Sequence, residues 1–320
     1  MMPDSSVSSA QPDVGPGAEL AAGLDAAQPF IAPKFLYDPL GCKLFEAICE
    51  LPEYYPTRTE AAILQQHGAE LARVAGAGVT LIDLGAGNCA KAASLFGLLR
   101  PAQYVAVDIS AAFVQDAVER LRQCHPHIDM LALGLDFSSR LDLPATVRSG
   151  RRLFFYPGSS IGNFDPDQAL AFLRRVRAQC GSDGALLIGL DLVKPHDVLE
   201  AAYDDALGVT AAFNLNILRH ANRLVGTDFD LAQWRHRAFF NAQASRIEMH
   251  LVAREDLQVR WPGGQRTFQR GESIHTENSH KYRQRAALAL LAEAGFGATQ
   301  VWTDPNEWFA LVYARPGGAA

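Results

Sequence analysis

The stretch "VTLIDLGAGNCAKAASLF", residues 79–96, combines an apolar strand, a glycine-rich turn and the start of a helix. Gly85 and Gly87 lie in the turn, where the absence of a side chain lets a ligand approach the backbone closely. A G-x-G pair alone is equally typical of a tight turn that is needed only for steric reasons. The stretch therefore predicts the first strand of a parallel sheet, and a ligand site there needs support from further residues.

The residues that follow repeat this alternation of strand and helix. Helical patterns, with apolar positions three and four apart, cover residues 111–124 and 166–180. Continuously apolar strands joined by helices are typical of a parallel sheet that is covered on both faces. The further strands are expected at residues 104–110, 130–137, 152–160 and 185–193.

The alternation breaks after residue 195. Residues 196–243 are expected to be mostly helical, and two period-two runs, 246–255 and 257–269, predict antiparallel strands. The chain then closes with a helix and two more strands, expected at 281–296, 298–304 and 307–315. The fold class is therefore α/β, with a seven-stranded, doubly wound, Rossmann-like sheet and a second, smaller α+β lobe.

This reading divides the chain into three parts. Residues 1–25 are rich in Ser, Pro and Gly, and they predict a flexible tail rather than a signal peptide. The sheet domain is expected to take residues 63–195 and 284–320. The second lobe, which is expected to bind the substrate, takes residues 26–62 and 196–283.

The composition excludes several kinds of partner. The formal net charge is −6 and no long basic run occurs, so neither nucleic acid nor an anionic membrane is expected. No stretch approaches the roughly 20 apolar residues of a membrane span. The 5 cysteines form no CxxC pair, so neither a zinc site nor a disulfide framework is predicted. We expect a cytoplasmic protein with reduced thiols and no metal, and a monomer.

Polar residues at the ends of the next two strands favour an adenosine site. Asp108 ends the second strand, where a carboxylate can bind both ribose hydroxyls. Asp136 and Phe137 end the third strand, where a carboxylate can accept from the adenine amine and an apolar ring can lie beside the base. Each acid alone is more often a helix cap or a solvated loop residue. Three strand ends together make a nucleotide site the better interpretation.

The type of adenosine cofactor is less directly specified. The spacing G-x-G-x-x-A also permits a dinucleotide. Asp83, immediately before the turn, would lie awkwardly beside a pyrophosphate, but it suits the cationic methionine part of S-adenosylmethionine. The order of strands, closed by a helix and two strands, resembles the class I methyltransferases. We therefore expect S-adenosylmethionine, bound by Gly85, Gly87, Lys91, Asp108, Asp136, Phe137 and Gly158.

Several long motifs resemble one family, the L-histidine Nα-methyltransferases of ergothioneine biosynthesis. The resemblance runs from about residue 30 to the C-terminus. It implies a class I sheet with a substrate lobe, and three methyl transfers to one α-amino nitrogen that convert L-histidine to hercynine. The motifs are "LPEYYPTRTE" (51–60), "PGSSIGNF" (157–164), "AYDDALGVTAAFN" (202–214), "RIEMHL" (246–251) and "HTENSHKY" (275–282).

The resemblance assigns the imidazole ring of the substrate to Glu277 and Ser279. If "HTENSHKY" is extended, residues two apart point to the same side. A carboxylate and a hydroxyl on one face can bind the two ring nitrogens, and the carboxylate would be left unpaired by a phenylalanine-like side chain. His275 and His280 flank the pair, but their spacing is not that of a helical metal site, and we interpret them as ordinary strand or loop residues.

The same resemblance assigns the rest of the substrate. It implies that Asn163 and Tyr203 hold the carboxylate end, that Tyr54 reaches the imidazole through water, and that Tyr37 lies beside the reacting nitrogen. Met249 corresponds to a wall of the pocket. Ordinary structural roles remain open for three of them: a helix cap for Asn163, a half-buried helix residue for Tyr203 and a core residue for Met249.

Three alternative functions remain at this point. The same scaffold could methylate another amino acid, such as tryptophan. A dehydrogenase that uses NAD is the alternative from another enzyme class. A regulatory module that binds adenosine without catalysis is the third, although polar residues from three separate segments favour an enzyme.

Overall fold

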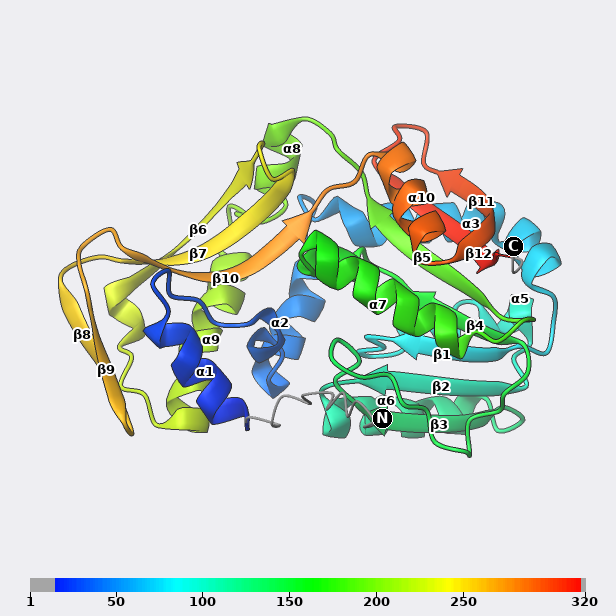
Figure 1. Cartoon of the computed structure of the whole chain (residues 1–320), viewed down its shortest axis with the longest axis horizontal. Helices are drawn as coiled ribbons and strands as arrows, with labels where there is room; N and C mark the ends of the chain where they lie inside the picture. Colours follow the sequence, from blue (N-terminus) through cyan, green and yellow to red (C-terminus); the bar gives the residue numbers. More distant parts are fainter. Residues whose placement is uncertain (1–14, 318–320) are drawn as a thin grey trace, which may run out of the picture.

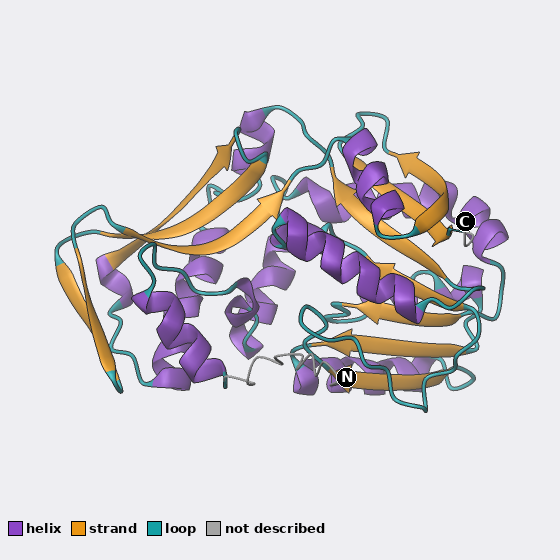
Figure 2. Ribbon diagram, viewed as in Figure 1, coloured by secondary structure: helices purple, strands orange, loops and turns teal. Residues whose placement is uncertain are grey.

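A computed structural model of the chain describes residues 15–317. The chain folds into two lobes that lie side by side, an α/β lobe and a smaller lobe of long strands and helices (Figure 1). Figure 2 shows that strands run through both lobes, whereas the longest helices lie against the sheet of the α/β lobe or beneath the strands of the smaller one.

The α/β lobe is built on a seven-stranded sheet with the order β11-β12-β5-β4-β1-β2-β3. Strands β1 to β5 are parallel, and β12 is antiparallel to both of its neighbours. The predicted sheet is therefore confirmed, including the two closing strands. The strands are β1 Thr80–Leu84, β2 Gln103–Asp108, β3 Asp129–Gly134, β4 Arg152–Tyr156, β5 Ala185–Asp191, β11 Phe296–Thr303 and β12 Phe309–Pro316.

Helices cover both faces of this sheet, as continuously apolar strands require. One face packs against α3 to α6 and the other against α7 and α10. The order of strands reverses between β1 and β4, and ligands bind at such a switch point, beyond the carboxyl ends of the strands. The helices are α3 Tyr55–Ala75, α4 Ala90–Ala93, α5 Phe96–Leu99, α6 Ala111–Cys124, α7 Pro166–Gln179 and α10 Gln284–Glu293.

The smaller lobe has a core of its own that joins distant parts of the chain. A three-stranded sheet, β10-β7-β6, packs against helices from the N-terminal segment and from the insertion, and β8 and β9 form a separate hairpin. Its elements are α1 Pro16–Asp25, η1 Pro33–Leu36, α2 Pro39–Cys49, α8 His196–Ala201, α9 Val209–Val225, η3 Leu231–Gln233, β6 Trp234–Asn241, β7 Arg246–Ala253, β8 Leu257–Trp261, β9 Gly264–Phe268 and β10 Ser273–His280.

Two expectations for this lobe were wrong. The tail predicted over residues 1–25 contains helix α1, whose Leu20 and Leu24 are buried in the core. Residues 1–14 of that tail lie outside the described residues. The region 196–243 is not mostly helical to its end, because residues 234–241 form strand β6. His236 interrupts the apolar alternation of β6, and it is buried because its ring nitrogens bond Asn214 and the Tyr203 carbonyl.

Two expectations from composition can be compared with the structure. All 5 cysteines have free thiols. Across residues 15–317, the longest helices are too short or too polar to cross a membrane.

Candidate functional site

The glycine turn after β1 has the conformation that only glycine adopts readily. Gly85 and Gly87 have φ angles of 71° and 52°, in the left-handed region. The Gly87 N–H donates to Asp108 Oδ2 at 2.9 Å, so the acid at the end of β2 braces the turn. A Cβ at Gly87 would meet nothing within 4 Å, which leaves open space over this part of the turn. The turn and Asp108 together can therefore accommodate an adenosine cofactor.

The third expected cofactor segment lies beside this turn. A Cβ at Gly85 would be 3.7 Å from the Phe137 ring, so Phe137 packs over the turn. Asp136 accepts from the Ser138 N–H at 3.1 Å and from Lys34 Nζ at 3.4 Å. Because Lys34 belongs to η1 of the smaller lobe, both lobes contribute to this edge.

Lys91 and Gly158, also expected to contact the cofactor, are joined by a residue that the sequence did not reveal. Glu60 of α3 is fully buried, accepts from Lys91 Nζ at 2.6 Å and accepts from the Gly158 N–H at 2.9 Å. This bond fixes the loop after β4 opposite the glycine turn. A glutamate in the helical run 55–75 gives no local signal of this role.

Asp83 does not occupy the position that we inferred for it. Its carboxylate is buried in β1 and accepts from the Tyr104 hydroxyl at 2.9 Å, inside the core beneath the sheet. Burial raises the pKa of Asp83 to about 7, against the opposing effect of Tyr104. The buried position of Asp83 therefore does not weigh against a pyrophosphate at the turn.

One pocket brings together every residue predicted to contact the substrate. It opens between the loop after β4 and the smaller lobe, next to Gly158. Phe45, Thr210 and Phe213 also line it, although nothing in the sequence marked them. The predicted residues on its lining are Tyr37, Tyr54, Asn163, Tyr203, Met249, Glu277 and Ser279.

A bulge in β10 turns Glu277 and Ser279 into this pocket. The pairing with β7 shifts between His275 and Glu277, so Thr276 is an extra residue. The burial pattern accordingly changes phase: Ile274, Thr276, Glu277 and Ser279 are buried, whereas His275 is not. Without the shift, Glu277 would share the face of His275 and point away from the pocket. The prediction that residues 277 and 279 share a side is confirmed.

Asn163 reaches the pocket because η2, Ser160–Asn163, lies directly against β10. A Cβ at Gly162 would be 2.8 Å from the His280 carbonyl oxygen, which only glycine avoids. The Asp165 side chain caps α7, so Asn163 is not the cap of that helix. Its amide is therefore available to the pocket.

Aromatic rings form the side of the pocket that faces the N-terminal segment. Tyr37 makes edge-on contacts with Phe45 and Phe213, at centroid distances of 5.7 Å and 5.6 Å. Tyr54 contacts Phe45 and Tyr203 in the same way, at 6.1 Å and 6.2 Å. Burial raises the pKa of Tyr37 and of Tyr54 well above the usual value, so both remain neutral phenols. This wall can surround a cation without ionised side chains of its own.

Glu277 is the carboxylate of the pocket, and it is 8% exposed. Burial raises its pKa to about 7, although Lys281 and the Asn163 amide oppose that rise. Met249 lies directly opposite it on β7, so a large apolar side chain borders the carboxylate. A buried carboxylate of this kind gains most from a ligand that donates a hydrogen bond to it.

A second group of buried charges lies behind the pocket and was missed by the sequence analysis. Lys281 Nζ donates to Asp191 Oδ2 at 2.8 Å, to Ser279 Oγ at 2.8 Å and to the Tyr203 hydroxyl at 3.0 Å. The Tyr203 and Ser279 hydroxyls are 2.7 Å apart. A signal was present, because Glu277, Ser279 and Lys281 continue one period-two row in "HTENSHKY".

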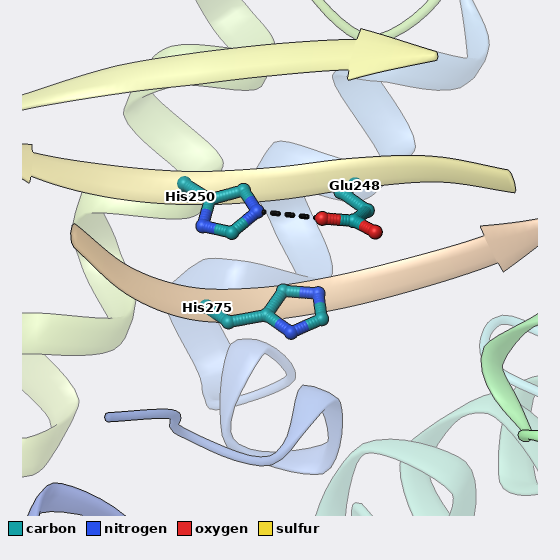
Figure 3. A group of neighbouring side chains, drawn as sticks. All are labelled: Glu248, His250 and His275. Atoms are coloured by element: carbon teal, nitrogen blue, oxygen red, sulfur yellow. Dashed lines mark hydrogen bonds and ion pairs between the residues drawn. The ribbon is translucent and has the colours of Figure 1, made fainter. Parts of the chain in front are cut away.

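On the other face of β10, Glu248, His250 and His275 lie side by side on neighbouring strands (Figure 3). The two rings are stacked, with centroids 4.7 Å apart and planes 10° from parallel. Nitrogen lone pairs lie in the ring plane, so stacked rings do not direct them to one metal ion. Glu248 already accepts from His250 at 3.0 Å and from Arg246 at 2.9 Å. This arrangement is a stacked ion-pair network.

The sheet order and the glycine turn beside a buried polar pocket define a Rossmann-like methyltransferase. The family model described as "Histidine-specific methyltransferase, SAM-dependent" matches residues 17–316. The chain belongs to this family, and its cofactor is therefore S-adenosylmethionine.

Relatives agree with this assignment. A histidine N-alpha-methyltransferase of Mycolicibacterium smegmatis is 41% identical over 302 residues, which cover 92% of this chain and 93% of that protein. A histidine N-alpha-methyltransferase of Mycobacterium tuberculosis is 38% identical, with coverage of 92% and 93%. Ergothioneine biosynthesis protein 1 of Neurospora crassa is 30% identical over 88% of this chain, but only 32% of that longer protein is matched.

Proposed function

We propose that this enzyme transfers three methyl groups from S-adenosylmethionine to the α-amino nitrogen of L-histidine, which yields hercynine for ergothioneine biosynthesis. The observation that carries the proposal is the convergence of Tyr37, Asn163, Glu277 and Ser279 on one pocket that Gly158 also lines. Residues from the N-terminal segment, the loop after β4 and the insertion meet there. Such a pocket suits a small zwitterion that carries a polar ring.

The polar groups can be distributed over the substrate by their chemistry. Glu277 and Ser279 offer an acceptor and a hydroxyl to the two ring nitrogens. Asn163 offers an amide that can donate to the carboxylate and accept from the amine. Tyr54 and Tyr203 border the ring and the carboxylate end. A tryptophan-like ring is larger and has only one nitrogen, so it could pair with Glu277 or Ser279 but would leave the other buried group without a partner.

The chain's contribution to catalysis is mainly alignment. The bound cofactor supplies an electrophilic methyl carbon on a sulfonium. The amine must present a free lone pair to that carbon, and Tyr37 and Asn163 are placed to orient it. Because Tyr37 remains a neutral phenol, its oxygen accepts from an N–H of the amine, and released protons leave through water.

The aromatic wall explains how the site can hold each intermediate. Every transfer makes the nitrogen larger and less able to donate hydrogen bonds, until the product carries a fixed positive charge. Tyr37, Phe45 and Phe213 present ring surfaces that attract such a cation without binding it through hydrogen bonds. The reaction ends at three methyl groups because the quaternary nitrogen has no lone pair.

The test is incubation of the purified chain with S-adenosylmethionine and each of the common amino acids, followed by mass spectrometry. Histidine should give products with one, two and finally three added methyl groups. Tryptophan should give none at equal concentration. If histidine stayed unmodified while another amino acid gained methyl groups, the proposed substrate would be wrong although the family would stand.

We propose that the monomer is the active form, because this chain by itself supplies the groups that the proposed substrate needs. Sedimentation of the active enzyme at assay concentration tests this. A dimer whose dissociation abolishes turnover would contradict it.

A further inference from the structure

Lys281 directs all three of its N–H bonds to defined partners. Its ammonium donates to Asp191, Tyr203 and Ser279, at distances of 2.8 Å, 3.0 Å and 2.8 Å. The side chain is fully buried. An ammonium has three hydrogens and no acceptor, so each partner must accept. The Tyr203 and Ser279 oxygens therefore each receive one hydrogen from Lys281.

The contact between the two hydroxyls uses one more hydrogen. Tyr203 and Ser279 have two hydroxyl hydrogens between them, and one lies in their 2.7 Å contact. A phenol is the stronger acid and the better donor, so Tyr203 donates to Ser279. Ser279 then accepts from both Lys281 and Tyr203, which fills its two lone pairs. Its own O–H is the hydrogen that remains for the pocket, so Ser279 can offer a ligand a donor and no acceptor.

Glu277 offers the opposite. An ionised carboxylate only accepts, and this one lines the same pocket as Ser279. Burial raises the pKa of the ligand-free Glu277 to about 7, but a ring N–H that donates to it stabilises the ionised form and holds it ionised at lower pH. The pair therefore presents one acceptor and one donor. A neutral imidazole matches that pair, because one ring nitrogen carries a hydrogen and the other is bare. An imidazolium has two N–H bonds, and the second would meet a hydroxyl hydrogen.

We propose that Lys281 is a specificity-determining positioning residue that fixes Ser279 as a donor, so that the pocket selects the neutral imidazole of its substrate. The proposal rests on the proposed function, in which the ring lies between Glu277 and Ser279. The other titratable groups around Glu277 and Lys281 are Tyr37, Tyr54, Tyr203, Asp191 and Lys194.

The charges behind Ser279 are suited to keeping this arrangement. Burial alone would lower the pKa of Lys281, but the Asp191 carboxylate outweighs it and raises that pKa. Asp191 also accepts from the Tyr55 hydroxyl and bonds Lys194. Burial lowers the pKa of Lys194 to about 8, so Lys281 keeps its positive charge to a higher pH than Lys194 does. Lys194 donates instead to Asp191, the Tyr55 hydroxyl and the Leu192 carbonyl, and not to Ser279 or Tyr203.

The test is nitrogen NMR of ring-labelled [15N]L-histidine bound to the full-length enzyme with S-adenosylhomocysteine, from pH 8 down to roughly pH 6, below the usual ring pKa of about 6.5. The wild-type complex should keep one pyrrole-type and one pyridine-type resonance throughout. Lys281→Met leaves a Ser279 lone pair free, so the bound ring should become imidazolium at the lower pH. The affinity of this variant for histidine at pH 8 should fall about tenfold, because Ser279 is no longer held with its hydrogen toward the ring and that hydrogen bond is weakened.

Three further variants separate this role from a structural one. Lys194→Met removes the other buried cation on Asp191, and it should lower the melting temperature without changing the ring resonances. Lys281→Met should weaken histidine binding much less in a Ser279→Ala background than in the wild type. Tyr203→Phe removes the second donor to Ser279, so this variant should also bind imidazolium. It replaces Lys281→Met in the test if that variant does not fold. Affinity for S-adenosylhomocysteine checks the fold of every variant.

The outcomes are distinct. Two pyrrole-type resonances in the wild type at roughly pH 6 would overturn the proposal while histidine remained the substrate. A neutral ring in Lys281→Met and Tyr203→Phe, with affinity unchanged, would also overturn it. Absence of histidine binding to the wild type would overturn the proposed function and this inference together.

Discussion

The proposed cofactor edge, at the carboxyl ends of β1 to β3, and the proposed substrate pocket are built differently. At the cofactor edge, Asp108 is half-buried and bonds the backbone of the glycine turn, and Asp136 bonds its own loop and Lys34. In the pocket, Glu277 and Ser279 are buried on a strand, and a buried ammonium lies behind them. Backbone geometry dominates the first region and buried charge dominates the second.

This difference indicates which region controls specificity. A glycine turn with an acid at the next strand end can serve many proteins that bind adenosine, because it recognises parts that those cofactors share. A buried carboxylate discriminates sharply, because any ligand that fails to donate to it leaves it desolvated and unpaired. Substitutions in the pocket should therefore change which amino acid binds, whereas substitutions at the turn should change only how tightly the cofactor binds.

The largest expected effect comes from the pocket. Glu277→Ala combined with Met249→Val should weaken L-histidine binding by about 100-fold, as expected when a hydrogen bond to a charged group is lost, and should admit tryptophan. Calorimetry in the presence of S-adenosylhomocysteine measures both affinities. Asn278→Ala is the matched control, because Asn278 neighbours Glu277 on β10 but does not line the pocket. Unchanged histidine affinity in the double variant would remove the basis for ring recognition by Glu277.

A smaller effect is expected at the cofactor edge. Asp108→Ala removes the acceptor of the Gly87 N–H and the expected partner of the ribose, so S-adenosylhomocysteine should bind about 30-fold more weakly. Asp108→Asn keeps one acceptor oxygen, so its affinity for S-adenosylhomocysteine should lie between those of the wild type and Asp108→Ala. Calorimetry of both variants would contradict the prediction if cofactor affinity stayed at the wild-type value.

Tyr37→Phe tests whether the aromatic wall also orients the amine. The substitution keeps the ring contacts with Phe45 and Phe213 and removes only the hydroxyl. Turnover should fall about tenfold, most in the later methylations, because one hydrogen bond no longer orients the amine. The ratio of mono-, di- and trimethyl products over time is the measurement. Equal rates and equal ratios in the two enzymes would sink the assignment.

A further expected effect concerns the stability of the ligand-free enzyme. Burial raises the pKa of Glu277 from 4.5 to about 7, so the folded state holds this proton more tightly than the unfolded state does. Its stabilising contribution is present below the unfolded pKa and is lost as the pH rises through 7. At pH 8 the ionised carboxylate costs about 3 kcal/mol, so Glu277→Gln should raise the melting temperature of the ligand-free enzyme by about 4 °C. At pH 5 the wild type and Glu277→Gln should have nearly the same melting temperature. An equal rise in melting temperature at pH 5 and pH 8 would show that ionisation of Glu277 is not its cause.

The sequence predicted the sheet and much of the pocket because both rest on local patterns. Continuous apolar runs mark the parallel strands, and the period of two in "HTENSHKY" places Glu277 and Ser279 on one side. Long motifs shared with one family supplied the residues that no period could identify. The roles of these residues in the reaction remain predictions.

What the sequence did not reveal depends on partners far along the chain. In the sequence Lys281 is an ordinary lysine after a strand, and only the fold brings Asp191, 90 residues earlier, beside it. Glu60 is one acid in a long amphipathic helix until Lys91 and the Gly158 N–H converge on it. Strand β6 was missed because His236 stands where an apolar residue was expected, and its burial depends on Asn214 and Tyr203. Helix α1 was missed because its leucines find their core only in the distant insertion.

The extra residue in β10 gives the pocket independence from the arm that precedes it. Thr276 absorbs the mismatch between the two halves of the strand, and the later half takes its alignment from Met249. Chain length in the β8–β9 hairpin can thus vary without rotating Glu277 and Ser279, provided that the extra residue at position 276 is kept. An insertion or deletion before residue 276 is therefore compatible with the same pocket, whereas the loss of residue 276 itself is not.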